Sequence, residues 1–265
     1  MARSYKRAFI TGATSGIGEA FAECLPAKTD LLLSGRNAEK LADLKQRLAV
    51  GGRDVEIVAA DLRRPADRKA LADKAEALEV DLFVNNAGLG HFSRFTETPA
   101  DAEAEMVDVN VVAVHGLTHA LLPGMIARAK ASRSRAGLIV VSSVIGHLPV
   151  PYFATYAATK AFDLALAEGL AEELSDEPVD ILALCPGATA TDFPSRAGAP
   201  GDMFERAESA SAVARKAMQA LGRRRVLVSQ LPMRLGLAYN TAIHRIATAG
   251  AHVYFNRMLR RPKGK

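Results

Sequence analysis

Tyr156 and Lys160 stand four residues apart in a helix-patterned segment, so their side chains lie on one face of that helix. A free phenol, with a pKa of about 10, is a poor acid or base at neutral pH. An ammonium group one helical turn away stabilises the phenolate and lowers this pKa, which suits the tyrosine to general acid/base catalysis. A helix that buries its tyrosine and leaves its lysine in solvent would show the same spacing, so the pair alone leaves both interpretations open.

A glycine-rich segment at 11–18 reads TGATSGIG and joins a short apolar run to a helix-patterned segment. Its glycines allow a tight turn and a close backbone approach to a pyrophosphate. The helix after them offers free N–H groups and the positive end of its dipole. Because the segment opens a series of alternating strands and helices, it favours a dinucleotide site over an ordinary strand-to-helix turn.

Seven short apolar runs alternate with longer helix-patterned segments along the chain. The runs are rich in Val, Ile and Leu and mostly lack a two-residue alternation, which is typical of parallel strands covered on both faces. This βαβ series predicts an α/β fold, a single Rossmann-type domain whose doubly wound parallel sheet has about seven strands flanked by helices. The predicted strands are 8–11, 31–34, 55–59, 82–85, 138–142, 179–184 and 226–228.

Two long helices are predicted in the second half of this series. Thr98 is expected to be the N-cap and Pro99 the first residue of a helix that runs to about Ala129. Another helix is predicted from near Tyr152 to near Leu174. Between them, residue 143 is a serine that follows a strand, at the sheet edge where ligands bind in open α/β folds.

Composition and charge set limits on the class of protein. The chain has 265 residues, 49% of them hydrophobic and 24% charged, which fits one globular α/β domain. The net charge of +5 is not gathered in one stripe, so nucleic-acid binding is not expected. Two cysteines, and six histidines without metal-ligand spacing, predict neither a disulfide framework nor a metal site. There is no signal-peptide core and no apolar run of about 18 residues, so a cytoplasmic protein is expected.

One domain is a better interpretation than two. We expect a catalytic domain at 1–229, with a substrate loop at about 191–210 that is rich in Pro, Gly and Ala. Residues 230–265 are expected to be a C-terminal extension of the same domain. An alternative role for the basic segment 233–265 is contact with a membrane surface.

Taken together, the motifs resemble the short-chain dehydrogenase/reductase family over roughly residues 6–192. The turn T-G-x-x-x-G-x-G is followed in order by NNAG at 85–88, Asn110, Ser142 with Ser143, YAATK at 156–160, and Pro186 with Gly187 and Thr191. The resemblance implies transfer of a hydride between a nicotinamide cofactor and a carbonyl or alcohol carbon.

By the same resemblance, four residues carry the chemistry. Tyr156 is the acid/base, and Lys160 tunes it and anchors the nicotinamide ribose. Ser143 polarises the substrate oxygen, whereas Ser142 is expected to point to the other side and make a hydrogen bond at the strand end. Asn110 helps to hold a water next to the lysine; its alternative is a polar residue on the surface of a long helix.

The resemblance also implies the residues that line the cofactor. Asp61 and Leu62 should meet the adenine, and either Thr189 or, preferably, Thr191 should contact the carboxamide. The expected set is Gly12, Thr14, Ser15, Gly16, Ile17, Gly18, Arg36, Asp61, Leu62, Asn86, Ala87, Gly88, Tyr156, Lys160, Pro186, Gly187, Thr189 and Thr191.

The choice of cofactor depends on the end of the second predicted strand. A carboxylate there would accept a hydrogen bond from the ribose 2′-OH and select NAD. Here that position is Gly35, and Arg36 follows it. A guanidinium suits a 2′-phosphate by charge and by geometry, which predicts NADP(H) over NAD(H). Many NADP-dependent members carry a second basic residue within the glycine turn, where this chain has Ser15.

The expected function is therefore NADP(H)-dependent reduction of an apolar ketone, aldehyde, ketoacyl or steroid-like substrate. Its pocket is expected to be built from 90–95, 147–153 and 192–206, which include Phe92, Phe95, Leu148, Tyr152, Phe153, Phe193, Met203 and Phe204. The alternatives are an NAD-dependent alcohol dehydrogenase of the same fold and a non-catalytic nucleotide-binding scaffold. A homodimer or homotetramer is expected, packed through the helices that begin near Asp101 and Tyr152.

Overall fold

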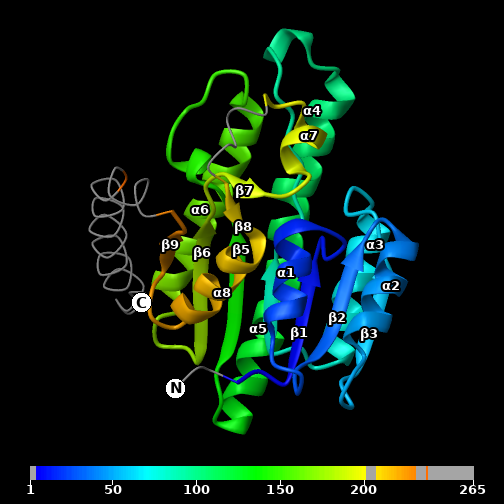
Figure 1. Ribbon diagram of the computed structural model, residues 1–265. Coiled ribbons are helices and arrows are strands. Elements are labelled where there is room, and N and C mark those ends of the chain that lie inside the picture. The colour runs from blue at the N-terminus through cyan, green and yellow to red at the C-terminus, as the bar shows by residue number, and fades with distance from the viewer. Residues whose placement is uncertain (1–3, 201–206, 231–236, 238–265) are drawn as a thin grey trace, which may run out of the picture.

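Seven parallel strands form one sheet in the computed structural model, which describes residues 4–200, 207–230 and 237. Their order is β3-β2-β1-β4-β5-β6-β9 (Figure 1). The strands are β1 (Arg7–Thr11), β2 (Asp30–Gly35), β3 (Val55–Ala59), β4 (Leu82–Asn85), β5 (Ala136–Val141), β6 (Val179–Cys185) and β9 (Val226–Val228). Each contains or overlaps one of the predicted runs, so the predicted doubly wound sheet is confirmed.

The strand order reverses direction at β1, which pairs with β2 on one side and with β4 on the other. Ile10 of β1 is opposite Leu33 of β2 and Val84 of β4. The connections that leave the carboxyl ends of β1 and β4 therefore diverge to opposite sides. This opens a crevice at the edge of the sheet where open α/β folds bind ligands.

Helices cover both faces of the sheet, which explains why the strand sequences are apolar throughout. Phe9, Phe83 and Leu138 point to the face covered by α3 (Pro65–Ala77), α5 (Val114–Ser132) and α6 (Ala154–Glu173). Their neighbours Ile10 and Val84 point to the other face, under α1 (Gly16–Cys24), α2 (Ala38–Leu48) and α8 (Ala210–Ala220).

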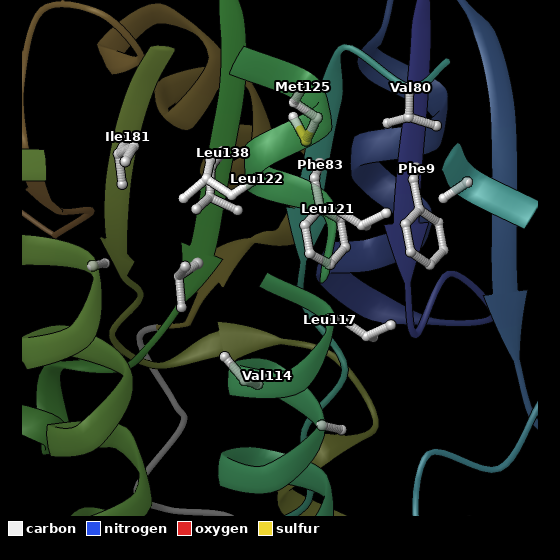
Figure 2. Packing of buried hydrophobic residues seen from close by; sticks show 14 of the residues in the cluster. Phe9, Val80, Phe83, Val114, Leu117, Leu121, Leu122, Met125, Leu138 and Ile181 are labelled. Carbon is white, nitrogen blue, oxygen red and sulfur yellow. The ribbon is translucent and has the colours of Figure 1, made fainter. Parts of the chain in front are cut away.

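The first of these two cores is centred on stacked rings. Phe9 and Phe83 lie on adjacent strands with ring centroids 5.0 Å apart. Leu121, Leu122 and Met125 of α5 belong to the same buried cluster (Figure 2). Burial of each such side chain stabilises the fold by roughly 1.5–3 kcal/mol. This packing holds β1 and β4, whose ends carry two of the sequence motifs, in a fixed relation.

The long helix predicted from Thr98 to about Ala129 is divided into three consecutive segments. They are α4 (Ala100–Val107), a π-helical segment η2 (Asp108–Ala113) and α5. The predicted N-cap at Thr98 is wrong. Pro99 holds that position, and the Thr98 hydroxyl instead donates to the carbonyl of Arg94 in the preceding 3-10 turn, η1 (Phe95–Glu97).

The combined helical run Ala100–Ser132 is long and apolar enough to cross a membrane by length and composition. Half of its most apolar window is buried inside the protein. Leu117, Leu121 and Met125 account for part of this apolar character, because they pack in the core under α5. The hydropathy of the run thus has a structural explanation in the packing of the sheet.

The helix predicted to begin near Tyr152 begins two residues later, at Ala154. The backbone of Tyr152 has φ +66°, in the left-handed region that a right-handed helix excludes. The carbonyl of Tyr152 accepts a hydrogen bond from Ser93 N, so this residue ties the start of α6 to the loop after β4.

Three short elements lie in, or directly before, the described part of the predicted substrate loop. β7 (Thr189–Ala190) pairs with β8 (Glu208–Ser209), and α7 (Phe193–Ala197) lies between them in the chain, beyond the carboxyl edge of the sheet (Figure 1). Another 3-10 turn, η3 (Val144–His147), follows β5. Residues 201–206 of the loop, and all of 231–265 except Leu237, lie outside the described residues.

Candidate active site

One cavity of about 390 Å³ lies at the carboxyl ends of the central strands. It gathers residues from motifs that are far apart in the sequence. The site residues predicted from the sequence that line it are Gly12, Thr14, Ser15, Gly16, Ile17, Arg36, Asp61, Leu62, Asn86, Ala87, Gly88, Ser143, Tyr156, Lys160, Pro186, Gly187, Thr189 and Thr191. The glycine turn and the predicted chemical residues therefore share one space.

Two residues of the predicted set do not line this cavity. A Cβ on Gly18 would lie 2.3 Å from the Gly12 carbonyl oxygen, so Gly18 serves the packing of the turn on its own helix. Asn110 is fully buried behind the cavity wall. Both support residues that do line it.

The glycine turn has a shape that only glycine permits at two positions. Gly12 has φ +65° and Gly16 has φ +59°, and a Cβ on either would come 2.9 Å from Ala87 Cα or Thr191 Cγ2 respectively. α1 begins at Gly16, and the side chain of its N-cap residue, Ser15, does not cap the helix. The first N–H groups of α1 thus lie at the cavity without a side-chain partner from Ser15, which fits the binding of a pyrophosphate.

Thr11 connects the glycine turn to the NNAG segment, a role that the motif alone did not reveal. Its hydroxyl oxygen accepts hydrogen bonds from Asn86 N at 2.9 Å and Ala87 N at 3.0 Å. The side chain of Asn86 donates back to the Thr11 carbonyl at 2.9 Å. This reciprocal contact fixes the two walls of the cavity against each other.

Tyr156 is buried among aromatic rings at the other end of the cavity. Its ring centroid lies 5.5 Å from that of Phe153 and 5.3 Å from that of Phe193. Burial raises the pKa of the phenol, while the Lys160 ammonium and a hydrogen bond from Ser143 act to lower it. The predicted influence of Lys160 is therefore present, but desolvation outweighs it in this structure.

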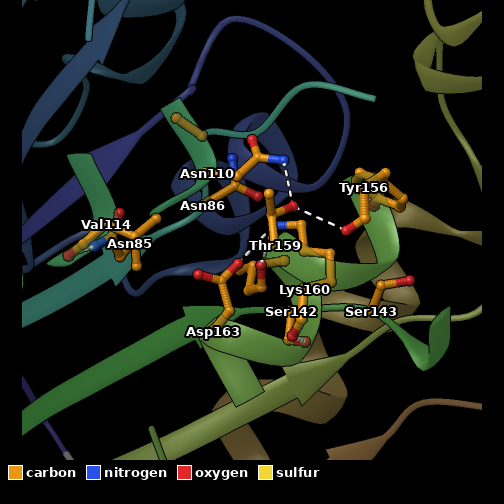
Figure 3. A network of polar contacts seen from close by, with 12 residues as sticks. Asn85, Asn86, Asn110, Val114, Ser142, Ser143, Tyr156, Thr159, Lys160 and Asp163 are labelled. Carbon is orange, nitrogen blue, oxygen red and sulfur yellow. Dashed lines mark hydrogen bonds and ion pairs between the residues drawn. The ribbon is translucent and has the colours of Figure 1, made fainter. Parts of the chain in front are cut away.

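Lys160 lines the buried floor of the cavity, where its ammonium has two hydrogen-bond acceptors. Nζ donates to the Val141 carbonyl and to Asp163 Oδ2, each at 2.9 Å (Figure 3). Desolvation acts to lower the pKa of Lys160, but the neighbouring Asp163 and Tyr156 shift the pKa upward. Asp163 is not distinguishable as a site residue in the sequence, because an acid on a helix is usually solvent-exposed.

Asn110 holds the loop after β4 against α6. Its amide oxygen accepts from Leu89 N at 2.8 Å, and its amide nitrogen donates to the Leu89 carbonyl at 2.8 Å and to Thr159 Oγ1 at 3.0 Å (Figure 3). The π-helical turn brings this side chain inward, and such turns are frequent at functional sites. The alternative of an exposed polar residue is therefore wrong.

The hydrogen bond predicted for Ser142 is present, although Ser142 also lines the cavity. Its hydroxyl donates to the Lys160 carbonyl at 2.6 Å, so it braces the α6 backbone from the end of β5.

Cys185 is fully buried, and burial raises the pKa of its thiol to about 12, which leaves no thiolate at neutral pH.

Charged residues meet at the end of the cavity where Arg36 lies. Glu105 of α4 is 3.4 Å from Arg36 Nη1 and 3.2 Å from Arg63 Nη1. Asp61 forms a further ion pair with Arg63, which lowers the pKa of this carboxyl to about 2. Arg36 remains more than half exposed, so its pairing with Glu105 is screened by solvent and weak.

A second cation reaches the glycine turn from a distant segment. Arg196 of α7 donates to Ser15 Oγ at 3.2 Å and lines the cavity. A basic residue therefore lies beside the turn in space, although residue 15 itself is serine. No local sequence pattern predicts this contact, because the two residues are 181 positions apart.

The lining near Tyr156 is largely apolar, but it includes only part of the predicted pocket. Phe153 and Phe193 line it together with Val144, Ile145 and Val150. Phe95, Leu148 and Tyr152, which were also expected there, are about half or more exposed on the surface. Met203 and Phe204 lie outside the described residues.

Comparison with known proteins gives matches over the whole fold. A family model described as short chain dehydrogenase matches residues 6–202. Oxidoreductase UcpA of Escherichia coli (strain K12) is 36% identical over 192 residues, which cover 70% of each chain. A short-chain dehydrogenase from Sphingobium yanoikuyae in complex with NADPH has a TM-score of 0.79 and 29% identity over 98% of both chains. A short chain dehydrogenase/reductase from Burkholderia phymatum in complex with NAD has a TM-score of 0.76 and 26% identity, covering 100% of this chain and 98% of that one.

Proposed function

The chain belongs to the short-chain dehydrogenase/reductase family, and on that premise we propose that it is an NADP(H)-dependent reductase of an apolar carbonyl compound. The observation that carries the proposal is the convergence of Ser143, Tyr156 and Lys160 on the cavity that the glycine turn also lines. A non-catalytic nucleotide-binding scaffold would not require these three side chains to lie together in one cavity.

Tyr156, Ser143 and Lys160 each have a different role in the proposed reaction. When bound, the nicotinamide cofactor supplies the hydride. Tyr156 donates a proton to the carbonyl oxygen, and the Ser143 hydroxyl donates a hydrogen bond to the same atom, where negative charge develops. The Lys160 ammonium stabilises the phenolate that Tyr156 leaves behind.

Two guanidinium groups support the choice of NADP(H). Arg36 follows the position where a carboxylate would select NAD, and Arg196 lies beside the glycine turn at Ser15. Because the contact of Arg36 with Glu105 is long and exposed, a 2′-phosphate could replace it at little cost. The solved relatives bind either nicotinamide cofactor, so this preference needs a direct test.

The substrate class follows from the lining beside Tyr156. Phe153, Phe193, Val144, Ile145 and Val150 offer no charge to a ligand there, and Ser143 and Tyr156 supply the polar groups. Sites of this kind bind apolar molecules and fix their orientation through a few hydrogen bonds. We therefore expect a ketone, aldehyde, ketoacyl or steroid-like substrate.

We further propose that the protein assembles through α5 and α6. Ala154, Ala158, Ala161 and Ala165 form one exposed face of α6 at helical spacing. Gly116 of α5 and Gly169 of α6 stand within helices, and a Cβ on either would meet open space. Glycine destabilises a helix interior by about 1 kcal/mol relative to alanine, and such small residues allow a partner helix to approach closely.

The first test is to titrate the purified protein with NADPH and with NADH, following nicotinamide fluorescence. We expect at least tenfold tighter binding of NADPH, because the 2′-phosphate gains charge-assisted hydrogen bonds. Arg36→Asp should abolish the preference, whereas Lys45→Asp, the same charge change on the exposed part of α2, should retain it. Tighter binding of NADH would favour an NAD-dependent alcohol dehydrogenase, and binding of neither would contradict the enzymatic proposal.

A further inference from the structure

Asp163 is a buried acid that the reaction described above does not use. It lies one helical turn after Lys160 on α6 and is 0% exposed. Its neighbours on the buried side of the helix, Leu164 and Ala167, are apolar and belong to the core. Burial of a carboxylate is expensive unless it is paired, so a role that requires the acid is the simplest reason for its presence.

Only one of the two carboxyl oxygens of Asp163 has a hydrogen-bond partner among the described residues. Oδ2 accepts from Lys160 Nζ at 2.9 Å, while Oδ1 is buried without a hydrogen-bond partner among the described residues (Figure 3). This incomplete pairing leaves burial as the dominant influence and raises the pKa of Asp163 to about 6. The carboxyl group therefore changes charge close to neutral pH.

Ionisable groups around this carboxyl come from two elements. Tyr156, Lys160 and Glu168 lie on α6, and Cys185 lies on β6 with its thiol protonated. The residue after β5 and the π-helical segment present neutral groups to α6: the Ser142 hydroxyl bonds the Lys160 carbonyl, and the Asn110 amide bonds Thr159. Lys160 is the positive group that acts electrostatically on Asp163.

We propose that Asp163 is a positioning residue that holds the Lys160 ammonium at the floor of the cavity and offsets its charge, and so controls how strongly Lys160 stabilises the Tyr156 phenolate. This inference rests on the proposed function, because it concerns the same acid/base pair. With Asp163 ionised, the pair with Lys160 is neutral and its support of the phenolate is reduced. With Asp163 protonated, the ammonium acts on Tyr156 in full.

The charges of Lys160 and Asp163 near Tyr156 determine in which direction the pKa of Tyr156 changes when Asp163 is replaced. Asp163 raises the pKa of Tyr156, and Lys160 lowers it. Replacing the acid with Asn keeps the size of the side chain and removes its negative charge. The proton shared by Tyr156 and Lys160 is then lost at a lower pH, whichever of the two groups releases it.

The test is a spectroscopic titration of Tyr156 in the full chain. Phenolate absorbance is followed against pH with NADP⁺ bound, and the same titration of Tyr156→Phe is subtracted to isolate Tyr156. We expect Asp163→Asn to lower the midpoint by about one pH unit or more. The control Asp180→Asn removes another buried acid, paired with Arg135 at the far end of β6, and should leave the midpoint unchanged. A midpoint that is the same with and without Asp163 would overturn the proposal.

A second measurement keeps the proposal testable even if Asp163→Asn fails to fold. Carbon-13 NMR of carboxyl-labelled aspartate should show one group that titrates near pH 6 in the unchanged protein. In Lys160→Met its midpoint should rise, because the ammonium that favours the carboxylate is gone. An aspartate spectrum in which Lys160→Met shifts the midpoint of no carboxyl group would overturn the proposal. Neither measurement uses a substrate, and NADPH binding in the fluorescence titration reports separately on the proposed function.

Discussion

At the scale of single residues, the environment of Tyr156 decides what the phenol can do. The ring is enclosed by Phe153 and Phe193, and its hydroxyl has polar support from Ser143 and Lys160. An acid/base group in such a buried site depends on the few charges near it, because each of them acts with little screening.

Removal of the phenolic hydroxyl tests this assignment directly. Tyr156→Phe should lower kcat for NADPH-dependent reduction of a panel of apolar ketones and aldehydes by at least about 100-fold, because the proton donor is lost. NADPH affinity should change little, since the ring and its packing remain. Full activity of this variant in steady-state assays would indicate that another group supplies the proton.

Asp163 also makes a prediction about stability and pH. Its pKa is raised from 3.8 to about 6, so the folded protein binds more protons than the unfolded chain between these values. The stability contributed by this group is therefore present at low pH and is lost as pH rises through that window. The free energy of unfolding of Asp163→Asn, minus that of the unchanged protein, should rise by about 2 kcal/mol between pH 4 and 6.5.

Urea denaturation at several pH values measures this difference. Leu164→Ala, a neighbouring core substitution without a titrating group, should instead give an offset that does not depend on pH. A flat difference for Asp163→Asn as well would show that the carboxyl group has the same proton affinity in both states.

At the scale of elements, the π-helical segment between α4 and α5 shows how a local irregularity positions a functional group. It turns Asn110 inward to three partners on the loop after β4 and on α6. A regular helix through the same residues would change the direction of this side chain relative to α5.

Asn110→Ala should destabilise the fold by about 2–4 kcal/mol, because the backbone groups of Leu89 and the hydroxyl of Thr159 lose a buried partner. Chemical denaturation measures the loss. Gln46→Ala, an exposed substitution on α2, should change stability by less than about 0.5 kcal/mol. Equal effects of the two substitutions would mean that the Asn110 contacts contribute nothing.

At the scale of the whole molecule, the exposed faces of α5 and α6 are unlike an ordinary solvent-facing helix. The exposed positions on α6 between Ala154 and Ala165 are small alanines, and Val112 near the end of the π-helical segment is 40% exposed. Small residues without charge permit close helix packing and carry no desolvation penalty, which suits an interface between copies of the chain.

Ala165→Arg should therefore dissociate the assembly, because a long charged side chain would have to be buried between closely packed helices. Size-exclusion chromatography with light scattering measures the mass of the particle. Ala42→Arg on the exposed side of α2 is the matched control and should leave the mass unchanged. A particle of one chain before substitution would refute the proposed assembly.

The sequence by itself determined the sheet, the order of its motifs and most of the cavity lining. Continuous apolar runs mark buried parallel strands. The turn before α1 requires glycine at fixed positions, and few sequences have glycine at that spacing. Both signals are local, so they can be recognised without knowledge of the fold.

Tertiary structure alone decided which distant groups complete the site. In the sequence, Asp163 cannot be distinguished from a solvent-exposed aspartate on a helix. In the folded protein it is 0% exposed and lies beside Lys160. The contact of Arg196 with Ser15 joins residues 181 positions apart. α6 starts at Ala154 because the left-handed backbone of Tyr152 cannot belong to a right-handed helix. The carbonyl of Tyr152 also accepts a hydrogen bond from Ser93 N, which is distant in the sequence. Each of these features depends on which groups are brought together and removed from water, and that is fixed only when the chain is folded.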